Sequence, residues 1–309
     1  DSRIPVCMNI SDIWCEKYRP STLEEIVLDK PTRNYFTKVK EEENIPNVLF
    51  VGRPGIGKTT LAKVIVNDLL KCQYLYINAS DENGIDTIRT KVLNFAQTKS
   101  LFGTIKIIIL DECDGLSLDA QKALRNSIEE YHDLTRFVLT ANYKHKIIPA
   151  LQSRCQVFDI NYDKNKYMSK LISIVKAENV KINKDQFTTI ANNCYPDFRK
   201  GINALQKYFL SDGNDKNAFN STEFFDGLDD LLTHKKYTLI RKHIIEHESL
   251  FNNDYDELFK HLFDYLYQSS ITEDKKRDCL ITVSRYFYQN SQCIDQEINF
   301  YSCILDLKV

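Results

Sequence analysis

The sequence lacks the features that mark membrane, secreted and zinc-binding proteins. No apolar run reaches the ~18 residues that a membrane-spanning helix needs, and no two cysteines have the C-x-x-C spacing of zinc sites. The N-terminal residues include no apolar segment like that of a signal peptide. We therefore expect an intracellular protein without membrane contact, whose nine cysteines are reduced thiols.

Charge of one sign is also scarce. The 41 basic and 43 acidic side chains leave a formal net charge of −2, so the chain is not a uniformly basic, DNA-coating protein. Any contact with nucleic acid has to come from a local basic stripe. The 309 residues, of which 43% are apolar, are enough for two or three domains of a globular protein.

The order of the apolar patterns predicts an α/β domain followed by helices. Short apolar runs alternate with helical patterns over residues 1–160, which is typical of a mostly parallel sheet covered on both faces. The expected strands are 47–51, 73–78, 105–110, 136–140 and 156–160. From residue 162 only helical patterns remain, at 166–178, 184–193, 199–210 and, after a polar linker at 211–217, over 222–309. The aromatic residues of this last block are expected in a core or a subunit interface.

Residues 52–59 carry the strongest functional motif. Their sequence, Gly-Arg-Pro-Gly-Ile-Gly-Lys-Thr, has the G-x-x-x-x-G-K-T spacing of a phosphate-binding P-loop, between an apolar run at 48–51 and a helical pattern at 60–70. Glycines let successive backbone N–H groups point at phosphate oxygens, and the helix N-terminus adds partial positive charge. Lys58 is expected to neutralise the β- and γ-phosphates, and the Thr59 hydroxyl to bind Mg²⁺.

A second motif completes this site. Four apolar residues at 107–110 predict a strand buried on both faces, and Asp111 and Glu112 follow at its carboxyl end, where parallel sheets place their ligands. Asp111 is expected to hold Mg²⁺ through its water shell, and Glu112 to polarise the attacking water. Two solvated acids at a strand end are the alternative, which the P-loop about fifty residues earlier disfavours.

Four further features extend the nucleotide site. Asn142 ends the next expected strand, where it can hold the attacking water or the γ-phosphate. Arg154, in Ser-Arg-Cys, suits a finger offered to the ATP of a neighbouring subunit. Arg199 opens a helix from which it can reach back to phosphate, and residues 14–20 can wall the adenine. Taken alone, each arginine fits a surface salt bridge equally well; the order and spacing of the set favour a nucleotide site.

One motif in the last block points elsewhere. Residues 243–247 read His-Ile-Ile-Glu-His, which matches the inverted zinc-protease signature H-x-x-E-H. Their surroundings have the pattern of an ordinary amphipathic helix, and the chain already contains a complete nucleotide site. We therefore interpret this segment as a structural helix.

Together these motifs resemble those of clamp-loader ATPase subunits of the AAA+ class, the replication factor C small subunits and their counterparts in tailed phages. The resemblance covers residues 12–210, and the last block matches only in length and helical character. Cys113 departs from the family, which usually has alanine there. The segments that carry the match are 16–20, the P-loop, 78–81 with 84–86, 111–114, 140–142, 153–155 and 197–199.

The resemblance implies an architecture and an activity. It implies an α/β AAA+ P-loop core with a parallel five-stranded sheet at 8–161, a small helical lid at 162–212 and an all-α collar at 220–309 that assembles a pentameric ring. It implies that ATP binding and hydrolysis open a sliding clamp and place it on primer-template DNA, and that clamp and DNA stimulate hydrolysis. The compartment would be the cytoplasm of a bacterial host for a phage protein, or the nucleus for a eukaryotic one.

The resemblance also assigns residues. The implied catalytic residues are Lys58, Asp111, Glu112, Asn142 and Arg154, with ATP as nucleotide and Thr59 and Asp111 at Mg²⁺. The implied nucleotide contacts are Cys15, Glu16, Lys17, Tyr18, Val27, Gly52, Gly55, Ile56, Gly57, Lys58, Thr59, Thr60, Asn142 and Arg199. The candidate DNA contacts are Arg89, Lys91, Lys99 and Arg125, of which Arg125 also suits a subunit interface.

Three other functions remain open at this point. An AAA+ DNA motor, of the branch-migration or replicative-helicase type, would need hexamers and a DNA-gripping insertion in the ATPase core, and no inserted loop is obvious between residues 111 and 140. A non-hydrolysing scaffold subunit is disfavoured by the intact Lys58, Asp111 and Glu112. A small-molecule kinase would leave the lid and collar without a role. Whether four identical subunits join a different fifth, or five distinct subunits assemble, stays undecided.

Overall fold

The computed structural model describes residues 13–81, 84, 86, 88–98, 105–211, 221–251 and 253–307. The chain divides into two compact units, Asp1–Gly213 and Asn214–Val309. No helix among the described residues is long and apolar enough to cross a membrane.

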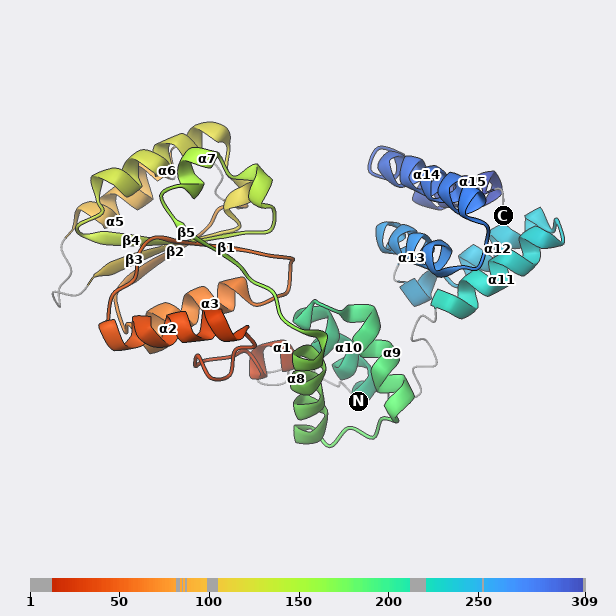
Figure 1. Cartoon of the computed structure of the whole chain (residues 1–309), viewed down its shortest axis with the longest axis horizontal. Coiled ribbons are helices and arrows are strands. Elements are labelled where there is room, and N and C mark those ends of the chain that lie inside the picture. Colours follow the sequence, from red (N-terminus) through yellow and green to blue (C-terminus); the bar gives the residue numbers. More distant parts are fainter. Residues whose placement is uncertain are drawn as a thin grey trace, which may run out of the picture. The chain divides into compact units, whose positions relative to one another are not determined.

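A five-stranded parallel sheet forms the centre of the first unit (Figure 1). The strand order is β2-β3-β4-β1-β5, so β2 and β5 are the edges. The sequence prediction of five strands is confirmed, with strand ends that differ by one residue at most. The strands are β1 (Val48–Val51), β2 (Tyr74–Asn78), β3 (Lys106–Asp111), β4 (Thr135–Ala141) and β5 (Gln156–Asp159).

Alternating strand residues build a separate core on each face of the sheet. Ile107 and Ile109 of β3 pack into the cluster under α2 (Lys30–Glu42) and α3 (Lys58–Val64), whereas Ile108 and Leu110 pack into the opposite cluster. Because side chains alternate between faces, a strand covered on both sides has to be apolar throughout. The helices of the second face are α5 (Leu93–Gln97), α6 (Leu118–Glu130) and α7 (Pro149–Gln152) (Figure 1).

Three helices follow the sheet within the same unit, α8 (Lys164–Ala177), α9 (Lys184–Cys194) and α10 (Phe198–Leu210). Their ends agree with the predicted helices to within two residues. Each begins at a side-chain cap, Asp163, Asn183 or Asp197, whose oxygen accepts a backbone N–H of the first turn. Buried side chains of these helices share one core with those around α2 and α3, so residues 162–211 do not separate from the sheet as a compact unit of their own.

A short N-terminal helix, α1 (Trp14–Lys17), packs on α10. The Trp14 backbone N–H donates to Gln206 Oε1 at 3.0 Å, and the Trp14 ring lies 5.4 Å from that of Phe209. Glu178, which follows α8, accepts hydrogen bonds from Lys17 Nζ at 2.6 Å and from Tyr18 Oη at 2.5 Å. These contacts fix residues 14–18 beside the loop that follows β1.

The described part of the second unit is entirely helical. Its elements are α11 (Ser221–Thr233), α12 (Tyr237–Glu246), η6 (Glu248–Phe251), α13 (Tyr255–Gln268), α14 (Glu273–Asn290) and α15 (Gln296–Asp306). Tyr255 and Phe259 are buried in its core, whereas Tyr267 and Tyr288 are 65% and 72% exposed. Some aromatic residues of this unit therefore form its core, and others lie on its surface. Most of the predicted linker at 211–217 lies outside the described residues.

The H-x-x-E-H segment lies on α12 and the residue after it. The His243 and His247 rings are 4.2 Å apart, and both contact the ring of Phe224. His243 Nε2 bonds to the Phe224 backbone oxygen at 3.2 Å, and burial lowers the pKa of His243. The predicted amphipathic helix is present, and its histidines take part in helix packing.

Candidate functional site

The glycines of the P-loop have the conformations that a phosphate cradle requires. Gly55 and Gly57 have φ values of 70° and 99°, in the left-handed region that favours glycine. A side chain at Gly55 would overlap the Asp197 carboxylate, whereas the space beside Gly57 is open. The Phe198 backbone N–H donates to the Gly55 carbonyl oxygen at 3.1 Å. The loop is thus tied to the first turn of α10.

Lys58 turns its ammonium group inward at the mouth of the loop. Its Nζ donates to the carbonyl oxygens of Gly52 and Arg53, both at 2.9 Å, and to Asn142 Oδ1 at 2.8 Å. The side chain is only 6% exposed, and this burial lowers the pKa of Lys58, partly offset by nearby carboxylates. An ammonium group forms stronger hydrogen bonds with a charged phosphate oxygen than with neutral carbonyl oxygens. Lys58 is therefore suited to bind a phosphate group.

Asp111, at the carboxyl end of β3, accepts hydrogen bonds from three hydroxyl groups. Thr59 Oγ1 donates to both carboxylate oxygens at 2.8 and 2.9 Å. Tyr76 Oη donates to Oδ2 at 2.8 Å, and Thr140 Oγ1 donates to Oδ1 at 2.5 Å. A 6% exposed carboxylate beside the P-loop threonine provides the oxygen donors that Mg²⁺ prefers. This donor set fits an Mg²⁺ ion bound together with a triphosphate.

Glu112 lies directly beyond this carboxylate in a left-handed backbone conformation, with φ of 56°. Its N–H donates to Thr140 Oγ1 at 2.9 Å, and its carboxylate accepts a hydrogen bond from Ser80 Oγ at 2.6 Å. The Asn142 backbone N–H donates to Asp114 Oδ1 at 3.2 Å. The acid that can polarise water is therefore held toward the end of β2.

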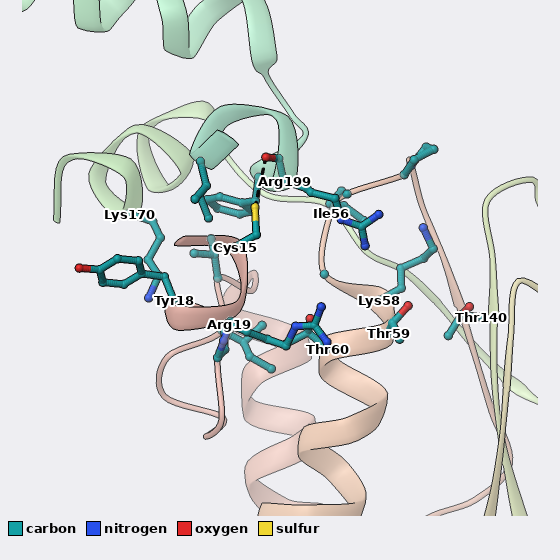
Figure 2. Close-up of a pocket in the computed structure, with 18 of the residues that line it drawn as sticks. Cys15, Tyr18, Arg19, Ile56, Lys58, Thr59, Thr60, Thr140, Lys170 and Arg199 are labelled. Carbon is teal, nitrogen blue, oxygen red and sulfur yellow. Dashed lines mark hydrogen bonds between the residues drawn. The ribbon is translucent and has the colours of Figure 1, made fainter. Parts of the chain in front are cut away.

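These groups open into one pocket, drawn in Figure 2. Among the predicted nucleotide contacts, the pocket is lined by Cys15, Tyr18, Val27, Gly55, Ile56, Gly57, Lys58, Thr59, Thr60, Asn142 and Arg199, joined by Asp111 and Glu112. Its apolar side is supplied from residues 15–27 and from α10, which suits a flat base. Figure 2 shows Cys15 and Arg199 close together, where the Cys15 thiol donates to the Arg199 carbonyl oxygen at 3.5 Å.

Three predicted contacts do not line the pocket. Glu16 pairs with Arg19 at 2.6 Å, Lys17 pairs with Glu178 at 2.6 Å, and Gly52 offers its carbonyl oxygen to Lys58. Arg19 and Pro20, which also line the pocket, lie within the predicted segment 14–20. The lining residues that were not predicted are Glu25, Ile26, Pro54, Thr140, Lys170, Phe198 and Ile202. Ile202 lies three residues after Arg199 on the same helix face, so the helical period could have indicated it. Lys170 of α8 has no such local signal.

Arg154 lies outside this pocket. It precedes β5, whose first residue, Gln156, pairs with Val48 at the start of β1. The P-loop follows the other end of β1, and four residues of strand span about 13 Å. The Arg154 guanidinium forms an ion pair with Glu129 of α6 and donates to the Ala150 carbonyl oxygen at 2.7 Å. It therefore faces away from the site of its own subunit.

The candidate DNA contacts are only partly described. Lys91 is exposed on η3 (Ile88–Val92), and η3 packs beside α6. Arg125 is half-buried on α6, where its guanidinium donates to Asn126 Oδ1 at 2.7 Å. The side chain of Arg89 and the whole of Lys99 lie outside the described residues. Two of the four candidates thus come from neighbouring elements on one face of the sheet.

The fold and the site resemble those of ATPase domains of the AAA class. Residues 48–162 match the family model described as "ATPase family associated with various cellular activities (AAA)". The fold is similar to a solved structure of the Thermotoga maritima RuvB Holliday junction branch migration motor, with a TM-score of 0.53 over 71% of this chain and 80% of that one. The two sequences are 16% identical, so this likeness concerns the fold alone.

The chain is also similar in sequence to replication factor C small subunits. The chain is 44% identical over 199 residues to that protein of Methanococcus maripaludis, covering 62% of this chain and 63% of the relative. It is 44% identical over 200 residues to that of Sulfolobus acidocaldarius, covering 63% and 62%. It is 43% identical over 201 residues to that of Archaeoglobus fulgidus, covering 63% of each. The predicted resemblance is confirmed, over a stretch that spans about 63% of these relatives' length.

Proposed function

We propose that this chain is an ATPase subunit of a sliding-clamp loader, which uses ATP to open the clamp and place it on primer-template DNA. The observation that carries the proposal is the position of Arg154. It lies at the amino ends of the strands, whereas the rest of the ATP site lies at their carboxyl ends. A finger placed this way serves a neighbour and makes hydrolysis depend on assembly. Sequence relatives named replication factor C small subunits support the same function.

Each residue of the site has a separate role in the proposed ATP hydrolysis. Lys58 exchanges its carbonyl partners for phosphate oxygens, and Thr59 and Asp111 hold Mg²⁺. When bound, Mg²⁺ neutralises charge on the β- and γ-phosphates. Glu112 accepts the proton of the attacking water, and Asn142, which now bonds to Lys58, positions that water or the γ-phosphate. Arg154 of a neighbouring subunit stabilises the charge that develops in the transition state.

Helices α8–α10 act as the lid in this proposal, and residues 220–309 act as the collar that assembles the ring. The hydrogen bond from Phe198 to Gly55 and the position of Arg199 in the pocket give the lid direct contact with the nucleotide loop. Lys91 and Arg125 contact the DNA phosphates, and loss of either would weaken binding uniformly across sequences and lower the salt slope by about one. The partners are other loader subunits, the clamp and primer-template DNA, inside the cell.

A DNA motor is the second candidate, since the fold is similar to a branch-migration motor. Such a motor needs an insertion that grips DNA. Between the ends of β3 and β4 the chain forms only η4 (Cys113–Gly115) and α6, with no added hairpin. Native mass measurement separates the two candidates, because a loader assembles as five subunits and a motor as six.

The deciding experiment measures ATP hydrolysis by the purified assembly with neither ligand, with clamp alone, with primer-template DNA alone, and with both. We expect the highest rate with both, because a loader should hydrolyse ATP only when its cargo and its target are present. Stimulation by DNA without any effect of the clamp would favour the motor. No hydrolysis under any condition would favour a scaffold subunit.

A further inference from the structure

Tyr76 occupies a place in the sheet from which it reaches the metal-binding carboxylate of the next strand. In the register of β2 and β3, Tyr76 lies opposite Ile109, and Asn78 lies opposite Asp111. Because side chains alternate along a strand, Tyr76 and Asp111 lie on the same face as diagonal neighbours. A diagonal separation of about 7–8 Å is within reach of a long aromatic side chain.

The contact between them is made by the tyrosine hydroxyl. Tyr76 Oη donates to Asp111 Oδ2 at 2.8 Å, and Lys63 Nζ of α3 lies 5.0 Å from the centre of the Tyr76 ring. The lysine places positive charge over the ring face, which favours this ring position. Tyr76 is 38% exposed because β2 is an edge strand, so its hydroxyl can be removed without opening a core.

The other hydroxyls on Asp111 show what Tyr76 contributes. Thr140 donates to Oδ1 from β4, and Tyr76 donates to Oδ2 from β2, so one carboxylate oxygen is held from each strand that flanks β3. Thr59, the third donor, is the residue expected to bind Mg²⁺ itself. Once Thr59 turns to the metal, Thr140 and Tyr76 are the two groups that still orient the carboxylate.

We propose that Tyr76 is a positioning residue for Mg²⁺, acting through Asp111 and therefore resting on the proposed ATPase function. Hydrogen bonds to a metal-binding carboxylate fix its orientation and keep it charged, and their loss typically lowers metal affinity about 10–100-fold. The Tyr76 hydroxyl is close to solvent, so we expect the lower part of that range.

The test is Tyr76→Phe in the full chain, with Tyr74→Phe as the matched control. Tyr74 lies two residues earlier on the same face of the same strand and is also 38% exposed, but its hydroxyl makes no hydrogen bond within the described part of the chain. Binding of a fluorescent, non-hydrolysable ATP analogue is measured during an Mg²⁺ titration and, separately, in EDTA. We expect Tyr76→Phe to raise the Mg²⁺ concentration for half-maximal binding about tenfold.

A merely structural tyrosine would not produce this pattern. Metal-free binding in EDTA should be the same for all three proteins, and saturating Mg²⁺ should restore Tyr76→Phe to the wild-type level. An unchanged or lower Mg²⁺ requirement in Tyr76→Phe overturns the inference, as does an equal shift in Tyr74→Phe. If wild-type protein shows no Mg²⁺-dependent nucleotide binding, the proposed function fails. If wild type shows such binding and Tyr76→Phe does not alter it, only the inference about Tyr76 fails.

Discussion

Arg154 forms an ion pair with Glu129 within its own subunit. The pair lies at the amino ends of the strands, and the P-loop lies at their carboxyl ends. The Arg154 side chain is 32% exposed and that of Glu129 49%, so the pair is near the surface and stabilises the fold by no more than about 1 kcal/mol. A neighbouring subunit can therefore replace Glu129 with a phosphate at little cost. In the proposed function, Glu129 balances the charge of Arg154 until the subunits assemble.

Arg154→Ala should separate nucleotide binding from hydrolysis. We expect ATP affinity within about twofold of wild type and turnover by the assembled complex lowered about 10³-fold, because the finger acts only on a neighbour's transition state. Equilibrium binding of a fluorescent ATP analogue and steady-state phosphate release measure the two quantities. Glu129→Gln serves as the control, since it removes the same ion pair but keeps the arginine. Full turnover by Arg154→Ala, or by isolated wild-type monomer, contradicts a site shared between subunits.

Ser80→Ala tests whether the Ser80 hydroxyl restrains Glu112. The hydrogen bond of 2.6 Å holds the carboxylate toward β2, and loss of about 1 kcal/mol of restraint corresponds to roughly fivefold more of the freed conformer. We expect hydrolysis without clamp or DNA to rise about fivefold at unchanged ATP affinity. The gain should disappear when Glu112→Gln is added. A fall in turnover would mean that Ser80 instead orients Glu112 for catalysis.

Lys58→Ala should abolish nucleotide binding. The Lys58 ammonium group is buried at the mouth of the P-loop, and its loss removes a charge-assisted contact to the phosphates. We expect ATP affinity to fall at least about 100-fold, from a charge-assisted contact of about 3 kcal/mol. Isothermal titration with an ATP analogue measures the loss. Lys122→Ala, which removes an exposed lysine of α6 that pairs with Asp119, is the control, and equal weakening by both would show that the effect is not specific to the loop.

The sheet and the phosphate half of the site could be predicted because their signals are local. Residues 107–110 are apolar without interruption since both faces of β3 are covered, and a short run of this kind is typical of a buried parallel strand. The P-loop spacing is set by the backbone turn around one phosphate group, so eight consecutive residues contain all of it. The predictions for Asn142 and Arg154 also came from local signals, the end of an expected strand for Asn142 and the Ser-Arg-Cys segment for Arg154.

The contacts that were missed depend on residues far apart in the sequence. Tyr76 meets Asp111 only because β2 pairs with β3 in one particular register, which neither strand shows by itself. Lys170 reaches the pocket only because α8 packs beside residues 25–27, more than one hundred residues earlier in the sequence. Lys17 and Glu16 were predicted as nucleotide contacts, but they do not line the pocket. Lys17 pairs with Glu178, which follows α8, and Glu16 pairs with Arg19.

Glu178 predicts how the docking of α1 depends on pH. Burial tends to raise the pKa of Glu178, but the hydrogen bonds from Lys17 and Tyr18 outweigh it and hold the pKa below its ordinary value. A carboxyl group whose pKa is lower in the folded protein stabilises the fold above its unfolded-state pKa of about 4.3, and this contribution is lost as the pH falls. The contact should therefore be fully formed at pH 7 and should be lost progressively as the pH falls below about 4.3.

Trp14, the only tryptophan in the sequence, reports on this contact because it is buried on α1 at 4% exposure. At pH 7 we expect Glu178→Gln to shift Trp14 emission to longer wavelength and to lower stability by about 1 kcal/mol, a small value because the Lys17 side chain is 46% exposed. Wild type and variant should converge as the pH falls from 5 to 3. Glu16→Gln, which removes the exposed pair with Arg19, is the control. A difference that persists unchanged at pH 3 would show that the carboxylate charge of Glu178 does not hold α1 in place.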